Sequence, residues 1–442
     1  MKLPVKALST IAVLGLGMTS LAACGSSSGE ATAGGDRLTY WASNQAPTVE
    51  DDRKILEESL ARFTEETGTE VELEVIPWSD LYNRILTAVS SGEGPDVLNI
   101  GNTWATTLQE TGAFLPFEGD ALDAVGGQDR FIQSSWSTGG AEGQTPTSIP
   151  LYALSYSLYY NTEMFAAAGI ETPPKTWEEF VEAAKKLTID TDGDGQIDQW
   201  GVSLAGGSIS NNAHQAFVRG LEAGGSLFDE SGEPTFASDE QVAGVKQWVD
   251  LMATDKVVSP SNAEYTSGSQ MVDDFAAGNA AMFFDQAPGT NLASRGFDAY
   301  AAAPVPLTDP TATGDEATMS HVAGINLSVF SETDNQEGAL QLAAHLTSDE
   351  EQVYLNKSFS SLPVLTAAYD DEAFQSEEIT LKQSILENNA KPMPLISQEG
   401  QMETLVGTAI KDLFAQAATG TVTEADIRTA LEDANSQMAA AQ

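Results

Sequence analysis

Oxygen-bearing side chains between positions 190 and 198 have the spacing of a calcium-binding EF-hand loop. The candidate ligands are Asp190, Asp192, Asp194, Gln196 through its carbonyl, and Asp198. Oxygen atoms at this spacing can surround one hard cation, and Gly195 stands where such loops turn sharply. The twelfth position is Gly201 instead of the usual glutamate, so a distant residue would have to complete the shell, or binding would be weak. The alternative is an exposed Asp/Gly turn without a metal, and either role would be structural rather than catalytic.

Aromatic, amide and hydroxyl side chains follow several predicted strands at the point where each strand ends. They include Trp41, Asn44, Gln45, Trp78, Asn102, Thr103 and Trp104, while Tyr152, Ser155 and Tyr156 stand at the entry of the second lobe. In open α/β sheets, ligands bind beyond the carboxyl ends of the strands. An aromatic ring can cover the C–H face of a pyranose, while amides and hydroxyls pair with its OH groups. The set therefore suits a carbohydrate, although core packing explains any single aromatic equally well. We assign Trp177, Trp200 and Trp248, which lie in or beside helix patterns, to structure.

The only cysteine, Cys24, closes the tetrapeptide Leu-Ala-Ala-Cys at 21–24. It follows Lys2, Lys6 and an apolar stretch over 11–18 that is too short to cross a bilayer of about 30 Å. This pattern is typical of a secretory signal peptide over 1–23 and a lipidated cysteine with acyl chains such as palmitate. Gly, Ser and Ala dominate the residues after it, so 24–35 is predicted to be a flexible linker. A buried structural cysteine is the alternative. We expect an extracytoplasmic protein held at the cell membrane by its lipid alone.

Composition excludes several classes of function. Lys and Arg total 20 against 65 Asp and Glu, a formal net charge of −45. Nucleic-acid binding needs clustered basic residues, so we expect none. The negative charge also disfavours anionic ligands unless a local basic pocket overrides it. The alternative is that the acidity provides only solubility. His214, His321 and His345 lack metal-ligand spacing, and no nucleophile elbow, phosphate loop or dinucleotide fingerprint occurs. With so many carboxylates, a glycosidase acid pair cannot be recognised.

Apolar periodicity predicts alternating strands and helices that would position these residues. Strands are expected over 38–41, 71–75 and 97–100, with helices between them that end at Gly68 and Gly92. Beyond residue 150 we expect strands over 155–160, 280–285 and 299–306. Capping boxes that begin at Thr176, Ser238 and Ser348 mark helix starts. The order predicts two α/β lobes with mostly parallel sheets flanked by helices, followed by a helical C-terminal part.

Five short segments stand out in one order along the chain. They are GPDV at 94–97 ahead of Trp104, Pro150 followed by YYN at 159–161, PPKTWEEF at 173–180, FAAGNAAM at 275–282 and AGIN at 323–326. Together they resemble landmarks of the extracellular solute-binding proteins of ABC sugar importers, the family that includes maltose-binding protein. The resemblance covers residues 36–440.

The resemblance implies a periplasmic-binding-protein-like fold with sugar held between two lobes joined by a hinge. The first lobe would contain 36–147 and 299–347, and the second 148–298 and 348–442. By position, the resemblance implies ligand contact at Asn44, Gln45, Thr103, Trp104, Tyr152, Ser155, Ser210 and Asn211. To these we add, as further candidates for ligand contact, Trp78, Asn102, Tyr156, Asp285, Gln286 and His321. This chain has DQAP at 285–288 where the family often has Gly-x-Trp, and no aromatic at 398–402. These departures argue against maltodextrin as the sugar but not against the sugar class.

The leading interpretation is a binding protein, not an enzyme, that captures a di- or oligosaccharide and delivers it to the transmembrane subunits of an ABC permease. We expect a monomer that requires no cofactor, apart from the calcium suggested by the 190–198 loop. Two alternatives remain open. One is a surface-anchored glycoside hydrolase, and the other is the same fold binding a polyamine, a peptide or a metal complex.

Overall fold

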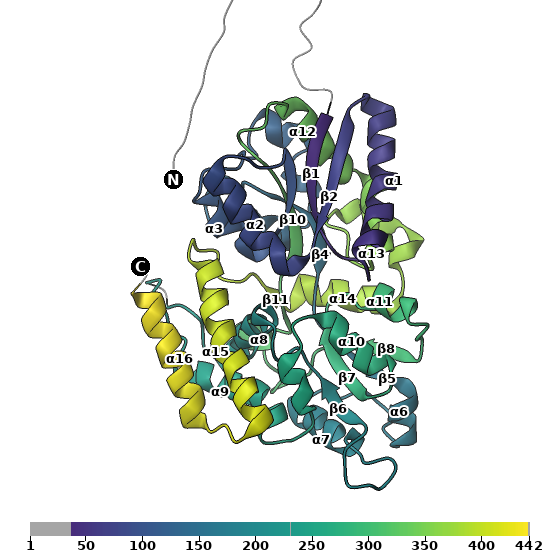
Figure 1. Cartoon of the computed structure of the whole chain (residues 1–442), viewed down its shortest axis with the longest axis vertical. Coiled ribbons are helices and arrows are strands. Elements are labelled where there is room, and N and C mark those ends of the chain that lie inside the picture. The colour runs from purple at the N-terminus through teal and green to yellow at the C-terminus, as the bar shows by residue number, and fades with distance from the viewer. Residues whose placement is uncertain (1–36, 230, 441–442) are drawn as a thin grey trace, which may run out of the picture. The chain divides into compact units, whose positions relative to one another are not determined.

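The computed structural model describes residues 37–229 and 231–440, which form an α/β protein with helix-flanked sheets (Figure 1). The predicted signal peptide, Cys24 and the linker over 24–35 lie outside the described residues. In the described part, no helix combines the length and the apolar character that a membrane crossing needs.

The first sheet has five strands in the order β2-β1-β3-β10-β4. β1 pairs in parallel with β2 and β3, whereas β10 is antiparallel to both β3 and β4. Only β10 is therefore reversed, which agrees with the predicted mostly parallel sheet. The strands are β1 (Arg37–Ser43), β2 (Glu70–Ile76), β3 (Val97–Gly101), β4 (Ile149–Leu154) and β10 (Ala323–Val329).

The second sheet has four strands in the order β6-β7-β5-β8, and again one strand, β5, is reversed. Its strands are β5 (Ser157–Asn161), β6 (Trp200–Ser203), β7 (Ala280–Asp285) and β8 (Tyr300–Ala303). A short parallel pair joins β9 (Ser320–His321) to β11 (Ala390–Lys391). The predicted two-lobed α/β class is confirmed, with one sheet in each lobe.

Sixteen α-helices lie in the described part of the chain, and the last third is mostly helical. They are α1 (Val49–Thr67), α2 (Trp78–Ser91), α3 (Ala105–Gln109), α4 (Asp120–Ala124), α5 (Gln133–Trp136), α6 (Thr162–Ala167), α7 (Trp177–Leu187), α8 (Ile209–Glu222), α9 (Asp239–Ala253), α10 (Gly268–Ala276), α11 (Gly289–Ser294), α12 (Gln336–Leu346), α13 (Asp349–Phe359), α14 (Glu377–Asn388), α15 (Glu399–Thr419) and α16 (Glu424–Ala439). One 3₁₀ turn, η1 (Asn102–Trp104), matters for the site below.

Local signals placed several helix ends correctly. Gly68 and Gly92 end α1 and α2 in the left-handed conformation, with φ of 78° and 71°, which glycine adopts without steric cost. The capping box at Thr176 opens α7 as predicted. Ser348 caps α13, but its box stays incomplete because the Glu351 carboxylate pairs with Arg62 at 2.6 Å instead. An ion pair between distant segments therefore takes the place of the local capping contact of Glu351.

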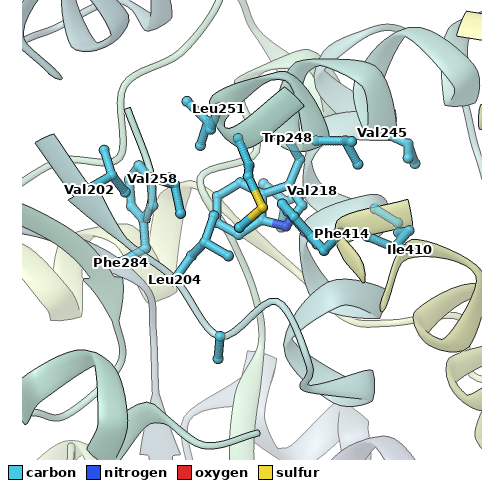
Figure 2. Packing of buried hydrophobic residues seen from close by; sticks show 14 of the residues in the cluster. Val202, Leu204, Val218, Val245, Trp248, Leu251, Val258, Phe284, Ile410 and Phe414 are labelled. Atoms are coloured by element: carbon cyan, nitrogen blue, oxygen red, sulfur yellow. The ribbon is translucent and has the colours of Figure 1, made fainter. Parts of the chain in front are cut away.

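Both sheets are buried on two faces. In β3, Val97 packs in the cluster that contains α1, α12 and α13, whereas Leu98 and Ile100 pack in the cluster that contains α2 and α3. In the second lobe, Trp248 lies among side chains from β6, β7, α8, α9 and α15 (Figure 2). Its indole N–H donates to Asn212 Oδ1 at 3.2 Å, so a buried donor is satisfied. The structural assignment of Trp177 and Trp248, 8% and 4% exposed, agrees with this packing.

The sheets divide the chain differently from the predicted lobe boundaries at three places. β4 was assigned to the second lobe but pairs with β10 in the first sheet. β8 lies in the 299–347 segment assigned to the first lobe, yet it pairs with β5 in the second sheet. α13 follows residue 348 but packs in the core of the first sheet. The periodicity of an element identifies its type, whereas its pairing partner depends on contacts distant in sequence.

The chain crosses from the first sheet to the second at Ser155 and Tyr156, within the strand predicted over 155–160. This crossing joins the carboxyl end of β4 to the amino end of β5. Because β5 is antiparallel to β7, its first residue Ser157 lies opposite Asp285, the last residue of β7. The chain returns between β8 and β10, and it crosses again between α13 and α15. The crossing therefore links the carboxyl edges of the two sheets, where most of the predicted ligand residues lie.

Candidate functional site

Asn44, Trp78 and Trp104 form one cluster beyond the ends of β1, β2 and β3. The Trp78 backbone N–H donates to Asn44 Oδ1 at 2.7 Å, and the Trp78 and Trp104 rings stack with centroids 4.6 Å apart. The Trp104 ring also contacts Tyr82 at 4.8 Å and is only 6% exposed. The structure thus brings three predicted residues together, but it places Trp104 in the core between α2 and the sheet rather than at the surface.

Gln45 is held by a carboxylate that the sequence did not reveal. The backbone N–H groups of Gln45 and Ala46 both donate to Asp52 Oδ1, at 2.8 and 2.9 Å. Burial raises the pKa of Asp52 to about 7, and the two N–H donors partly oppose this shift. Asp52 in the first turns of α1 therefore orients the loop that follows β1.

Tyr152 and Ser155 have structural roles. The Tyr152 ring is 1% exposed in the first-lobe core, edge-on to Phe359 at 5.5 Å. Ser155 is fully buried, and its hydroxyl donates to the Lys382 carbonyl at 2.9 Å. Both were predicted to contact ligand, and we do not retain that assignment. Both side chains are buried among other protein groups near the point where the chain passes from β4 to β5, so a ligand would not reach them.

The second-lobe candidates gather around Tyr156. Its hydroxyl lies 3.1 Å from Asn211 Oδ1 and 3.2 Å from His214 Nδ1. The His214 and His321 rings stack with centroids 3.9 Å apart. Ser208 caps α8 by accepting the Asn211 N–H, which places Ser210, Asn211 and His214 in the first turns of that helix. Ser210 and Asn211 are half-buried.

Burial determines the protonation of this cluster. It lowers the pKa of His214, and it lowers the pKa of His321 still further because the two imidazoles face each other. It raises the pKa of Tyr156, whereas a hydrogen bond with the Gln286 side chain opposes the rise. At neutral pH the cluster therefore offers uncharged hydrogen-bonding groups, which suit hydroxyl groups of a ligand.

Asp285 ends β7 beside a buried lysine. Asp285 Oδ1 accepts the Ala287 N–H at 2.9 Å. Burial raises the pKa of this carboxyl, and the positive charge of Lys382 partly opposes it. Lys382 is 1% exposed, and its Nζ donates to the Ser360 carbonyl at 3.2 Å. Sequence analysis did not identify Lys382, because nothing in the α14 segment marks it as buried.

The first turns of α15 connect the candidates of the two lobes. Thr103 Oγ1 donates to Glu403 Oε2 at 3.1 Å, and the Asn102 side chain donates to the Val322 carbonyl at 2.7 Å. The charge of Glu403 also acts on Tyr156 and His214 in the second lobe. Nearby, Thr106 and Thr107 donate to the Ile396 and Ser397 carbonyls, at 2.6 and 2.8 Å. Glu403 is therefore hydrogen-bonded to a first-lobe candidate, and its charge acts on second-lobe candidates.

Sequence analysis missed Glu399 and Glu403. Their spacing of four places them on one face of a helix, which was the available signal. That signal was hidden among 65 acidic residues. Both are buried, at 1% and 5% exposure, which distinguishes them from most of the others.

The 190–198 loop lies apart from these residues and has some of the expected geometry. One carboxylate oxygen from each of Asp190, Asp192 and Asp194 lies within 4.8 Å of the others. The carboxylate of Asp190 accepts the Gly193 and Gly195 N–H groups at 2.6 and 2.8 Å. Gln196 Nε2 donates to Asp194 at 3.2 Å, and Asp198 accepts from the Thr191 hydroxyl at 2.6 Å. Three of the predicted ligands are thus grouped, whereas Asp198 is engaged by its neighbour.

Comparisons with known proteins agree with this arrangement. Residues 46–353 match the family described as bacterial extracellular solute-binding protein. A putative binding protein of Brucella abortus (strain 2308) is 31% identical over 159 residues, 36% of this chain and 36% of that protein. The diacetylchitobiose binding protein DasA of Streptomyces coelicolor is 28% identical over 195 residues, 42% of this chain and 44% of DasA. The chain thus spans less than half the length of these curated relatives.

Among solved structures, a solute binding protein of an ABC transporter from Thermotoga lettingae, bound with α-D-tagatose, has a TM-score of 0.78. It is 23% identical, and the match covers 91% of this chain and 99% of that one, which shows a shared fold. The family match extends over more than half of the chain, and the two-lobed topology agrees with it. The chain therefore belongs to the bacterial extracellular solute-binding proteins.

Proposed function

We propose that this protein is a non-enzymatic binding protein that captures a sugar, a di- or oligosaccharide, and delivers it to the transmembrane subunits of an ABC importer. The observation that carries the proposal is the contact of Thr103 with Glu403. It places Glu403, whose charge acts on Tyr156 and His214 in the second lobe, beside the polar candidates at the carboxyl edge of the first sheet. Family membership supports a binding role, and relatives named for diacetylchitobiose and solved with tagatose support the sugar class.

The chemistry of the candidates favours a ligand without negative charge. Asn211, Tyr156 and Gln286 offer uncharged hydrogen-bonding groups, whereas Glu403 and Asp285 would repel phosphate or carboxylate. Lys382 is a basic group beside Asp285, and the charges of Glu378 and Asp285 offset it. A neutral sugar satisfies such a surface through its hydroxyl groups.

A panel of monosaccharides and disaccharides tests the proposal in a thermal-shift assay. We expect one sugar to raise the melting temperature in a saturable way, since ligand at 100 Kd adds about 2.7 kcal/mol to stability. The sugar should be recovered unchanged by chromatography. Release of smaller sugars would identify a glycoside hydrolase instead. If a polyamine or a peptide raises the melting temperature and none of the sugars does, the protein is a binding protein of this fold whose ligand is not a sugar.

We further propose that Cys24 carries the lipid that holds the protein at the extracytoplasmic face of the cell membrane, where it acts as a monomer. The support is the Leu-Ala-Ala-Cys segment at 21–24 and the linker composition after it. Cys24→Ala in the producing cell should move the protein from the membrane fraction to the soluble extracytoplasmic fraction. Unchanged membrane association would contradict the anchor, and light scattering that gives twice the chain mass would contradict the monomer.

We also propose a structural calcium ion at the 190–198 loop, supported by the grouped oxygens of Asp190, Asp192 and Asp194. Calcium should raise the melting temperature of chelator-treated protein, because an ion that binds the folded state alone stabilises it by mass action. Asp192→Asn should abolish most of this increase, whereas Asp250→Asn, remote in sequence, should leave it intact. Identical melting curves with calcium and with chelator would show that the loop is a plain turn.

A further inference from the structure

A small recess lies at the start of α15, next to candidates of the first lobe. Its volume is about 10 Å³, the space of one water-sized group. The lining residues are Asn102, Thr103, Thr138, Val322, Met393, Pro394, Leu395 and Glu399. Two of them, Asn102 and Thr103, belong to the predicted ligand set. Glu399 is the only charged residue of the lining.

Glu399 is buried without compensation. It is 1% exposed, and neither of its carboxylate oxygens has a hydrogen-bond partner among the described residues. The charged group that acts on it is Glu403, one helical turn along and of the same sign. Tyr82 from α2 faces the same two carboxyl groups. A buried carboxyl in such surroundings costs free energy unless a proton or a cation neutralises it.

We propose that this recess receives a protonated amino group of the ligand, so that the solute is a sugar bearing a basic nitrogen. The inference rests on the proposed sugar-binding function and names the substrate class of that site. An ammonium group has the size of a water molecule, carries three donors and brings the positive charge that Glu399 and Glu403 lack. Asn102 and Thr103 line the same recess, where their side chains donate to the Val322 carbonyl and to Glu403.

Binding of such a ligand has a definite proton balance. Burial and the neighbouring Glu403 raise the pKa of Glu399 well above its ordinary value. In this proposal the unpartnered carboxyl holds a proton in the free protein. When the ammonium group enters, the carboxylic acid becomes a carboxylate paired with it, and one proton leaves to the solvent. A sugar with a hydroxyl group at the same position would release no proton.

The first experiment needs no knowledge of the sugar. The melting temperature of the full protein is measured with methylammonium chloride and, at equal ionic strength, with tetramethylammonium chloride, which cannot donate hydrogen bonds. Methylammonium should stabilise the wild type more strongly and saturably, whereas Glu399→Gln should respond equally to both salts. Asp412→Asn, which removes an exposed carboxylate of the same helix, is the matched control and should behave as wild type. Equal responses of the wild type to the two salts would overturn the proposal.

The second experiment uses sugars that differ in one group. Glucosamine is compared with glucose, and chitobiose with cellobiose and diacetylchitobiose, by calorimetry in two buffers of different ionisation enthalpy. The amine-bearing member should bind at least about tenfold more tightly than its hydroxyl partner, with release of one proton, and Glu399→Gln should abolish both differences. A hydroxyl or acetamido sugar that binds as tightly as the amine would refute this inference and leave the sugar-binding function standing. If no sugar of a wide panel binds, the proposed function fails, whereas the methylammonium result still decides whether the recess accepts an amine.

Discussion

Replacement of Trp104 with alanine is expected to lower the free energy of unfolding by about 3–5 kcal/mol, the usual cost of removing a large buried aromatic. The indole is 6% exposed, stacks on Trp78 and contacts Tyr82, so its removal would leave a cavity between α2 and the first sheet. Urea unfolding followed by circular dichroism measures the loss. Sugar affinity should fall as well, because Trp78 and the adjoining Thr103 would lose their support.

Two companion variants make this result specific. Trp104→Phe keeps an aromatic ring against Trp78 and should lose much less stability than the alanine variant. Trp41→Ala removes a half-buried tryptophan of β1 that lies under Arg84, at 4.3 Å from the ring centroid to the guanidinium carbon. Its loss should also be smaller. An unchanged urea midpoint together with weak sugar binding in Trp104→Ala would show that the indole is a ligand surface and not a core residue.

Glu399→Gln is expected to stabilise the protein above neutral pH and to reduce the dependence of its stability on pH. The pKa of Glu399 is raised in the folded state by burial and by the nearby Glu403 charge, with Tyr82 as the third titratable neighbour. In the unfolded chain a glutamate titrates near about 4.3. Between these two values the folded state binds one proton more than the unfolded state, so wild-type stability falls as pH rises, by up to about 1.4 kcal/mol per pH unit. Glutamine keeps the shape and cannot ionise.

Urea unfolding at pH values from about 5 to about 8 checks this prediction. The stability of Glu399→Gln relative to wild type should increase across this range and should approach wild type near pH 5. Asp412→Asn removes an exposed carboxylate of α15 and should show no such trend. A constant difference between Glu399→Gln and wild type at all pH values would mean that Glu399 is ionised in the folded protein.

Local features of the sequence predicted several of the elements that surround the site. Gly68 and Gly92 ended the first two helices and Thr176 opened α7, because each acts through backbone groups within one turn. The period-2 pattern of 71–75 predicted β2, because successive side chains of a strand point to opposite faces of the sheet. Polar side chains beyond strand ends pointed to a binding edge, and the fold places Asn44, Asn102 and Asp285 at such edges.

The direction of individual side chains could not be predicted in the same way. Tyr152 and Trp104 follow the same rule of position as Asn102, yet their rings are buried in two different clusters. Ser155 has its hydroxyl on the Lys382 carbonyl, a contact between the crossing and α14. Whether a side chain is buried depends on which helices cover each face of the sheet. The sequence around these residues does not indicate which helices these are.

By itself, the sequence determined the class of the fold and the type and order of many of its strands and helices, because periodicity and caps act over a few residues, but it did not predict β4, β6 or β10. The family resemblance followed from five short segments in order. Only the tertiary structure decided that β8 belongs to the second sheet and that α13 packs on the first. Only it brought Glu403 to Thr103, 300 residues apart, and buried Glu399 beside them. Such contacts form when segments distant in sequence pack together, so the spacing of residues along the chain does not predict them.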